Sequence, residues 1–181
     1  MSASAVVMVI DMQVGVLDGC HDADAVTRRT AVLVDRARAA GVPVVWVQDH
    51  DDFPEDTPLW QVAAPLERLD GEVTVRKTRR DAFVGTDLYE VLAALGTTHI
   101  IVAGAQTDYC IRTTTQAAAV RGFDVTLVGD AHTTIDAVHD GTAISAEQII
   151  AHTNMYFSGL RYPGHQYAVE QHDRVDLQPR R

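Results

Sequence analysis

AVVMVI at residues 5–10, followed by Asp11, is the stretch that decides the fold class of this 181-residue chain. All six residues of the run are apolar, most are β-branched, and no polar residue alternates with them. A strand of this composition is typical of a parallel sheet that is covered on both faces. The sequence therefore predicts a parallel sheet buried between two layers of helices.

Similar short apolar segments recur along the chain and alternate with segments of helical spacing. We expect further strands at residues 44–47, 73–76, 99–103, 124–128 and, at the edge of the sheet, 166–169. We expect helices at residues 24–40, 59–69, 86–95, 110–120 and 145–157, and a loop over 129–141. This alternation predicts a three-layer α/β/α fold with a mostly parallel sheet of about six strands. Because no linker, repeat or break in composition divides the chain, we expect a single domain over residues 1–181.

The composition excludes some classes of function. A net charge of -10 argues against a general nucleic-acid binder, which would show a basic face. No apolar stretch approaches the roughly 20 residues that span a bilayer, and no signal-like segment begins the chain. We therefore expect a soluble, cytoplasmic protein with no nucleic-acid or membrane partner. Cys20 and Cys110 are too few for a disulfide framework. A single bridge between them stays possible, although free thiols fit a reducing compartment better.

Reactive side chains follow several of the expected strands. In open parallel sheets, ligands bind beyond the carboxyl ends of the strands. Asp11 follows the first strand, Lys77 follows the third, and Cys110 ends the turn after the fourth. We therefore expect a carboxylate, an amine and a thiol to meet at one rim of the sheet, although they are far apart in sequence.

These residue types suit nucleophilic catalysis. Cys110 falls in the first turn of an expected helix, where unpaired N–H groups and the helix dipole lower a thiol pKa. Lys77 would lower this pKa further, and Asp11 could accept the proton. N–H groups of the turn after Gly104 could stabilise an oxyanion. Structural alternatives stay open: Asp11 as a helix cap, Lys77 as a solvated charge, Cys110 as an inert buried residue, and Gly104 as a close-packing position.

Three segments together resemble the isochorismatase-like cysteine hydrolase superfamily over nearly the full chain. They are VVMVIDMQVGVL with Asp11, VRKTRRDAFVGTDL with Lys77, and VAGAQTDYCIRTTTQAAAVRGFDVTLVGDAHTT with Cys110. The resemblance implies that these three residues are catalytic and that Cys110 forms a thioester while an amide or related C–N bond is cleaved. It also implies a non-proline cis peptide at Ala105–Gln106, with the N–H groups of Gln106 and Cys110 as the oxyanion hole. Members that act on isochorismate lack the cysteine, so Cys110 argues against that chemistry.

Further segments indicate which branch of the superfamily the chain resembles. The nicotinamidase branch binds a metal through an Asp-x-His pair after the second strand and a later His. Here Asp49 is followed by His50 and Asp51, and no His follows before His99, so we expect no such metal site and no cofactor. WVQDHDDFPEDTPLWQV and AEQIIAHTNMYFSGL look more like a subgroup that includes streptothricin hydrolases, which open a lactam ring.

These observations lead to a functional hypothesis. We expect a homo-oligomeric hydrolase that acts on a small-molecule amide or lactam, with a cationic or heterocyclic amide as the first substrate to test. The candidates for substrate binding are His50, Trp60, Gln106, Tyr109 and Asn154. Core packing is an equal alternative for Trp60 and Tyr109, and we interpret His132 and His152 as structural. The alternative functions are a nicotinamidase-like amidase without the usual metal site, and a non-catalytic thiol sensor or binding protein.

Overall fold

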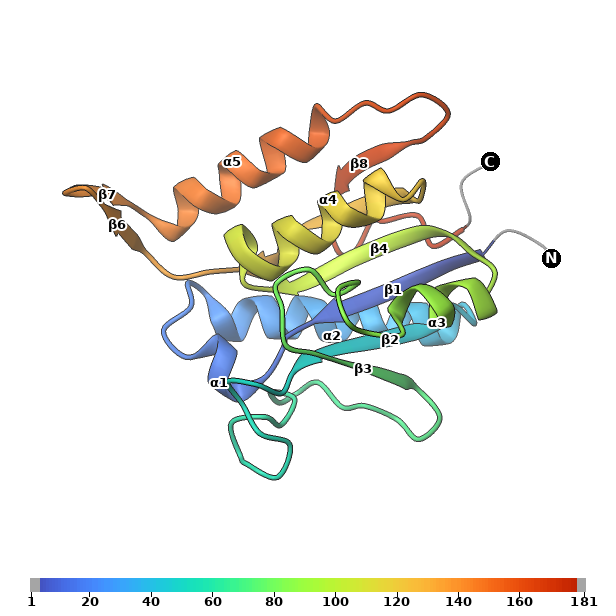
Figure 1. Ribbon diagram of the computed structural model, residues 1–181, viewed down its shortest axis with the longest axis horizontal. Helices are drawn as coiled ribbons and strands as arrows, with labels where there is room; N and C mark the ends of the chain where they lie inside the picture. Colours follow the sequence, from blue (N-terminus) through green and yellow to red (C-terminus); the bar gives the residue numbers. More distant parts are fainter. Residues whose placement is uncertain (1–3, 179–181) are drawn as a thin grey trace.

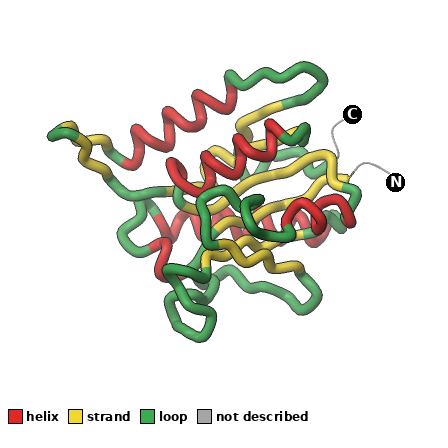
Figure 2. The backbone as a smooth tube through the Cα atoms, viewed as in Figure 1, coloured by secondary structure: helices red, strands yellow, loops and turns green. Residues whose placement is uncertain are grey.

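The computed structural model describes residues 4–178 and consists of a central sheet between two layers of helices (Figure 1, Figure 2). The strands of this sheet are β1 (Ser4–Ile10), β2 (Val44–Asp49), β3 (Val73–Lys77), β4 (Thr97–Ala105), β5 (Asp124–Thr133) and β8 (Tyr167–Glu170). All neighbours are parallel, in the order β3-β2-β1-β4-β5-β8. The predicted fold class and the six predicted strands are confirmed.

The two faces of the sheet carry separate apolar cores. The helices are α1 (Val14–Leu17), α2 (Ala23–Ala39), α3 (Leu88–Ala94), a π-helical turn η1 (Thr107–Ile111), α4 (Arg112–Val120) and α5 (Ala146–Ser158). Val7 and Val9 of β1 share one core with α2, whereas Met8 and Ile10 share the other with α3, α4 and α5. Figure 1 shows α2 behind the sheet and α3 and α4 in front of it. Burial on both faces explains why the run at residues 5–10 is apolar throughout.

The helix predicted over residues 59–69 is wrong, because this segment is irregular. Pro65 lies near its middle, and a proline there lacks an N–H donor and clashes with the preceding helical turn. The segment instead forms backbone hydrogen bonds with the residues that follow β1. The Ala63 N–H donates to the carbonyl oxygen of Met12 at 2.9 Å, and Gln13 and Val62 form an antiparallel bridge.

The loop predicted over residues 129–141 is also wrong. Strand β5 continues to Thr133, and a short hairpin follows, formed by β6 (Ala137–His139) and β7 (Thr142–Ile144). The register between β4 and β5 shifts after Val102, so that Gly104 pairs with His132. Asp130 and His132 interrupt the apolar pattern, which is why the sequence did not indicate a strand there. None of the helices within residues 4–178 is long and apolar enough to cross a membrane.

The strand order reverses next to β1. From β1 the chain passes to β2 and β3 on one side, and then returns to β4, β5 and β8 on the other. The carboxyl ends of β1 and β4 therefore lie at the topological switch point, where open α/β sheets leave room for a ligand. Asp11 directly follows β1, and η1 with Cys110 follows β4.

Candidate active site

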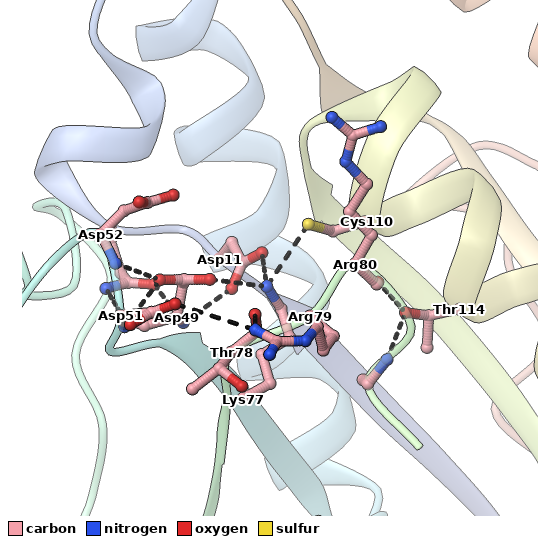
Figure 3. A network of polar contacts seen from close by, with 12 residues as sticks. Asp11, Asp49, Asp51, Asp52, Lys77, Thr78, Arg79, Arg80, Cys110 and Thr114 are labelled. Carbon is pink, nitrogen blue, oxygen red and sulfur yellow. Dashed lines mark hydrogen bonds and ion pairs between the residues drawn. The ribbon is translucent and has the colours of Figure 1, made fainter. Parts of the chain in front are cut away.

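Asp11, Lys77 and Cys110 meet at this switch point (Figure 3). Lys77 Nζ lies 2.7 Å from Asp11 Oδ2 and 3.3 Å from Cys110 Sγ. The side chains of Lys77 and Asp11 are 1% and 2% exposed, whereas Cys110 is partly accessible. The three strands β3, β1 and β4 thus bring an ammonium, a carboxylate and a thiol into one cluster, as the sequence led us to expect. The peptide bond Ala105–Gln106, which precedes the turn η1 that carries Cys110, is cis.

A second carboxylate holds the same ammonium. Asp49 Oδ2 lies 3.4 Å from Lys77 Nζ, because Asp49 ends β2 and is paired with Lys77 across the β2–β3 ladder. The Asp49 N–H donates to Asp11 Oδ1 at 3.0 Å and to Gln13 Oε1 at 2.8 Å. Asp11 itself has a positive φ of 51°, a conformation that few residues other than glycine, asparagine and aspartate adopt. The sequence placed Asp49 at this rim but did not indicate its contact with Lys77.

Burial dominates the protonation of the cluster. Burial raises the pKa of Asp11, although Lys77 opposes this effect. Burial alone would lower the pKa of Lys77, but the Asp11 carboxylate and Cys110 outweigh it and the pKa is raised. Burial and the Asp11 charge together raise the pKa of the Cys110 thiol to about 12, against the attraction of Lys77. The expectation of a lowered thiol pKa is therefore wrong: the free protein holds Cys110 as a thiol beside a carboxylate of increased basicity.

Removing the charge of Asp11 is expected to make Cys110 more reactive toward alkylation. The carboxylate raises the thiol pKa, so Asp11→Asn lowers it and leaves Lys77 to stabilise the thiolate. A neighbouring charge shifts a pKa by 1–3 units, so alkylation by iodoacetamide at about pH 8 should become roughly tenfold faster or more. The rate is measured by intact mass spectrometry in a Cys20→Ala background, which leaves one thiol. An unchanged or slower rate would contradict this account of the cluster.

A cavity of about 690 Å³ opens over the cluster. Its lining residues are Asp11, Gly15, Val16, Asp18, Asp49, Asp52, Phe53, Lys77, Thr78, Arg79, Arg80, Gln106, Tyr109, Cys110 and Ile135. Of the five residues predicted to bind substrate, Gln106 and Tyr109 line it. The other three do not: His50 is exposed, Trp60 is buried beneath Arg68, and Asn154 contacts His132. The space is large enough for a ligand well beyond the size of a simple primary amide.

Sequence reasoning did not identify which charged residues form the walls of this cavity. Asp18 and Asp52 contribute carboxylates, whose side chains form no ion pair or hydrogen bond with the described residues 4–178. The two arginines that line the cavity each contact a neighbouring side chain. The Arg80 guanidinium lies 4.1 Å from the ring centroid of Tyr109, and Arg79 lies 3.8 Å from Asp51. The available signal was that Asp52 and the two arginines fall in the segments after β2 and β3, whereas Asp18 follows the short helix α1 and carried no such signal.

The two histidines that we interpreted as structural differ in their burial. His132 is buried and contacts Thr107 and Asn154, whereas His152 is exposed on α5. Among the residues that the structure describes, no group of three or more His, Cys, Asp and Glu side chains is arranged to hold a metal ion. The absence of a metal site stays a prediction of the sequence.

The fold and this cluster define a class: parallel α/β proteins with a thiol, an amine and a carboxylate at the switch point of the sheet. Comparison with known proteins identifies the family. The isochorismatase domain model matches residues 4–153, so the chain belongs to the isochorismatase family. An isochorismatase structure from Pseudomonas putida KT2440 superimposes with a TM-score of 0.84 and 28% identity, covering 96% of this chain and 90% of that one.

Two named relatives are similar over part of the chain. A streptothricin hydrolase of Streptomyces noursei is 39% identical over 137 residues, which cover 71% of this chain and 54% of that protein. N-carbamoylsarcosine amidase of an Arthrobacter species is 29% identical over 126 residues, covering 58% of this chain and 48% of the amidase. The chain thus spans about half the length of these relatives.

Proposed function

We propose that the protein is a cysteine hydrolase that cleaves an amide or lactam C–N bond of a small molecule. One observation carries the proposal: Lys77 Nζ contacts both Asp11 and Cys110 at the base of the cavity. This arrangement provides a nucleophile, a base and a fixed positive charge within hydrogen-bonding distance of one another. The activities in the names of the two relatives, an amidase and a streptothricin hydrolase, support the same class of reaction.

The first half of the reaction acylates Cys110. As the sulfur attacks the carbonyl carbon, its proton passes to Asp11, whose raised pKa makes it an effective acceptor. The new S–C bond converts the carbonyl into an oxyanion, which the backbone N–H groups of Gln106 and Cys110 would stabilise. Lys77 balances the negative charge of Asp11 before the proton transfer and the negative charge that develops on sulfur during it. Because the thiol pKa is high, deprotonation accompanies bond formation instead of preceding substrate binding.

The second half releases the products. The proton on Asp11 is transferred to the leaving nitrogen as the C–N bond breaks, and the acyl group stays on Cys110 as a thioester. Asp11 then takes a proton from water, and the hydroxide attacks the thioester carbonyl. The C–S bond breaks, the acid departs, and the proton on Asp11 returns to the sulfur. Each group thus ends in its starting state.

The cavity favours substrates that carry a positive charge. Within residues 4–178 the Asp18 and Asp52 side chains form no ion pair or hydrogen bond, and Phe53, which also lines the cavity, offers an aromatic ring. Carboxylates and aromatic rings both attract ammonium or guanidinium groups. Arg80 lies on the side of Cys110 away from Asp52 in Figure 3. We therefore expect the best substrates to carry their cationic group away from the scissile carbonyl, on the side of the cavity where Asp52 lies.

A panel of amides and lactams tests the proposal. It includes 6-aminohexanamide, its neutral counterpart heptanamide, nicotinamide and caprolactam. We expect release of ammonia or amine from some members, with cationic members the better substrates, and a transient mass increase equal to the acyl group. Peptide mapping should place this adduct on Cys110, because only its thiol lines the cavity. Nicotinamide as the preferred substrate would support the nicotinamidase-like alternative.

The same measurements distinguish a hydrolase from a non-catalytic thiol sensor. A thiol sensor would be oxidised or alkylated at Cys110 without turnover and without an acyl intermediate. If no member of the panel were hydrolysed and no acyl adduct formed, while Cys110 was readily oxidised, the hydrolase proposal would be wrong.

A further inference from the structure

His132 connects the turn that carries the nucleophile to the rest of the fold. It lies on β5, is 1% exposed, and takes no part in the proposed reaction. Its Nδ1 lies 2.9 Å from Thr107 Oγ1, at the first residue of η1. Its Nε2 lies 2.9 Å from Asn154 Oδ1 on α5, and Asn154 Nδ2 donates to the carbonyl oxygen of Gly129 at 2.9 Å. A chain of hydrogen bonds therefore runs from α5 and β5 to η1.

The donors in this chain can be assigned. A carbonyl oxygen only accepts, so the contact with Gly129 directs the Asn154 amide nitrogen toward β5 and its oxygen toward His132. The His132 Nε2 must then carry a proton and donate it. Burial lowers the pKa of His132 to about 4, although Asn154 and Asp130 oppose this, so the ring is neutral and Nδ1 is an acceptor. The Thr107 hydroxyl donates to that acceptor.

We propose that His132 is a positioning residue that, through the Thr107 hydroxyl, fixes η1 so that Cys110 stays against Asp11 and Lys77. A second tether supports the same turn, since the Thr134 hydroxyl donates to Asp108 Oδ1 at 2.6 Å. The inference rests on the proposed function for its catalytic consequence, because misplacing a nucleophile slows its attack. Its effect on the thiol is independent of that function. Cys110 owes its high pKa chiefly to burial, so a loosened turn that exposes the thiol lowers this pKa, although the opposing effects of Asp11 and Lys77 both weaken.

Thr107→Val tests the inference by removing the hydroxyl while retaining the shape of the side chain. In the Cys20→Ala background at about pH 8, we expect iodoacetamide to alkylate Cys110 roughly fivefold faster or more, because the thiol pKa falls. On a substrate found with the amide panel, kcat should fall about tenfold or more with KM changed less than about threefold. Thr107→Ser retains the donor and should restore both quantities to within about twofold of the starting protein.

Thr126→Val is the matched control. Thr126 Oγ1 forms an equivalent 2.9 Å contact with His99 Nε2, and both residues are buried. His99 is near the start of β4, at the end of the sheet opposite to Cys110. This variant should lose stability without changing alkylation or kcat. If Thr107→Val alkylated at the same rate as Thr126→Val, His132 would be merely structural and the inference overturned, whether or not any amide is hydrolysed.

Discussion

Replacing Cys110 with alanine is expected to lower kcat/KM for amide hydrolysis by about a thousandfold or more, which corresponds to about 4 kcal/mol of transition-state stabilisation. The variant loses the atom that forms the thioester, and the remaining groups cannot replace it. Lys77 and Asp11 would keep their 2.7 Å ion pair, so the fold and the cavity should persist. The measurement is the rate of ammonia or amine release from the best substrate of the panel, together with intact mass for the acyl adduct.

Cys20→Ala provides the control for thiol loss. Cys20 is buried, does not line the cavity, and has a pKa raised to about 11, chiefly by burial. Its removal should leave most of the activity in place. Hydrolysis by Cys110→Ala at the rate of the unmodified protein would mean that another group attacks the carbonyl, and the proposed mechanism would then be incorrect.

The sequence was sufficient to predict the cluster because two simple patterns determine it. Each parallel strand is a short apolar run, and the carboxyl ends of such strands lie at one edge of the sheet. Asp11 directly follows β1, Lys77 is the last residue of β3, and Cys110 lies five residues after the end of β4. Their meeting therefore required only the strand assignments and the order of the chain.

The surroundings of the cluster could not be predicted in the same way. The thiol pKa depends on how deeply Cys110 is buried and how close Asp11 lies, and both are properties of the packed structure. A helix start favours the thiolate, but desolvation is the larger effect here. The cavity walls likewise depend on irregular segments such as residues 50–72, which have no periodic pattern from which their course can be deduced.

Gly104 links the fold to the position of the cluster. It pairs with Ile10 across β1 and β4, has a φ of 134°, and lies beside the residue that precedes Asp11. A Cβ atom at this position would lie 1.9 Å from the carbonyl oxygen of Ile10 and 2.8 Å from its nitrogen and carbonyl carbon. These are backbone atoms in the centre of the sheet, so no side chain can rotate away to relieve the clash. Any other residue must separate β4 from β1 where Asp11 and the Cys110 turn meet.

Gly104→Ala is therefore expected to destabilise the protein by more than about 4 kcal/mol, a large fraction of the 5–15 kcal/mol typical of a folded domain. Gly41→Ala is the matched control, because Gly41 also has a positive φ, of 69°, but has no atom within 4 Å of an added Cβ. That variant should lose only about 1 kcal/mol, the strain of the left-handed conformation. Guanidinium unfolding monitored by circular dichroism compares the two variants. Equal midpoints would show that β4 can move away from β1 at little cost. Asp11 and Cys110 would then owe their proximity to Lys77, not to the close approach of the strands.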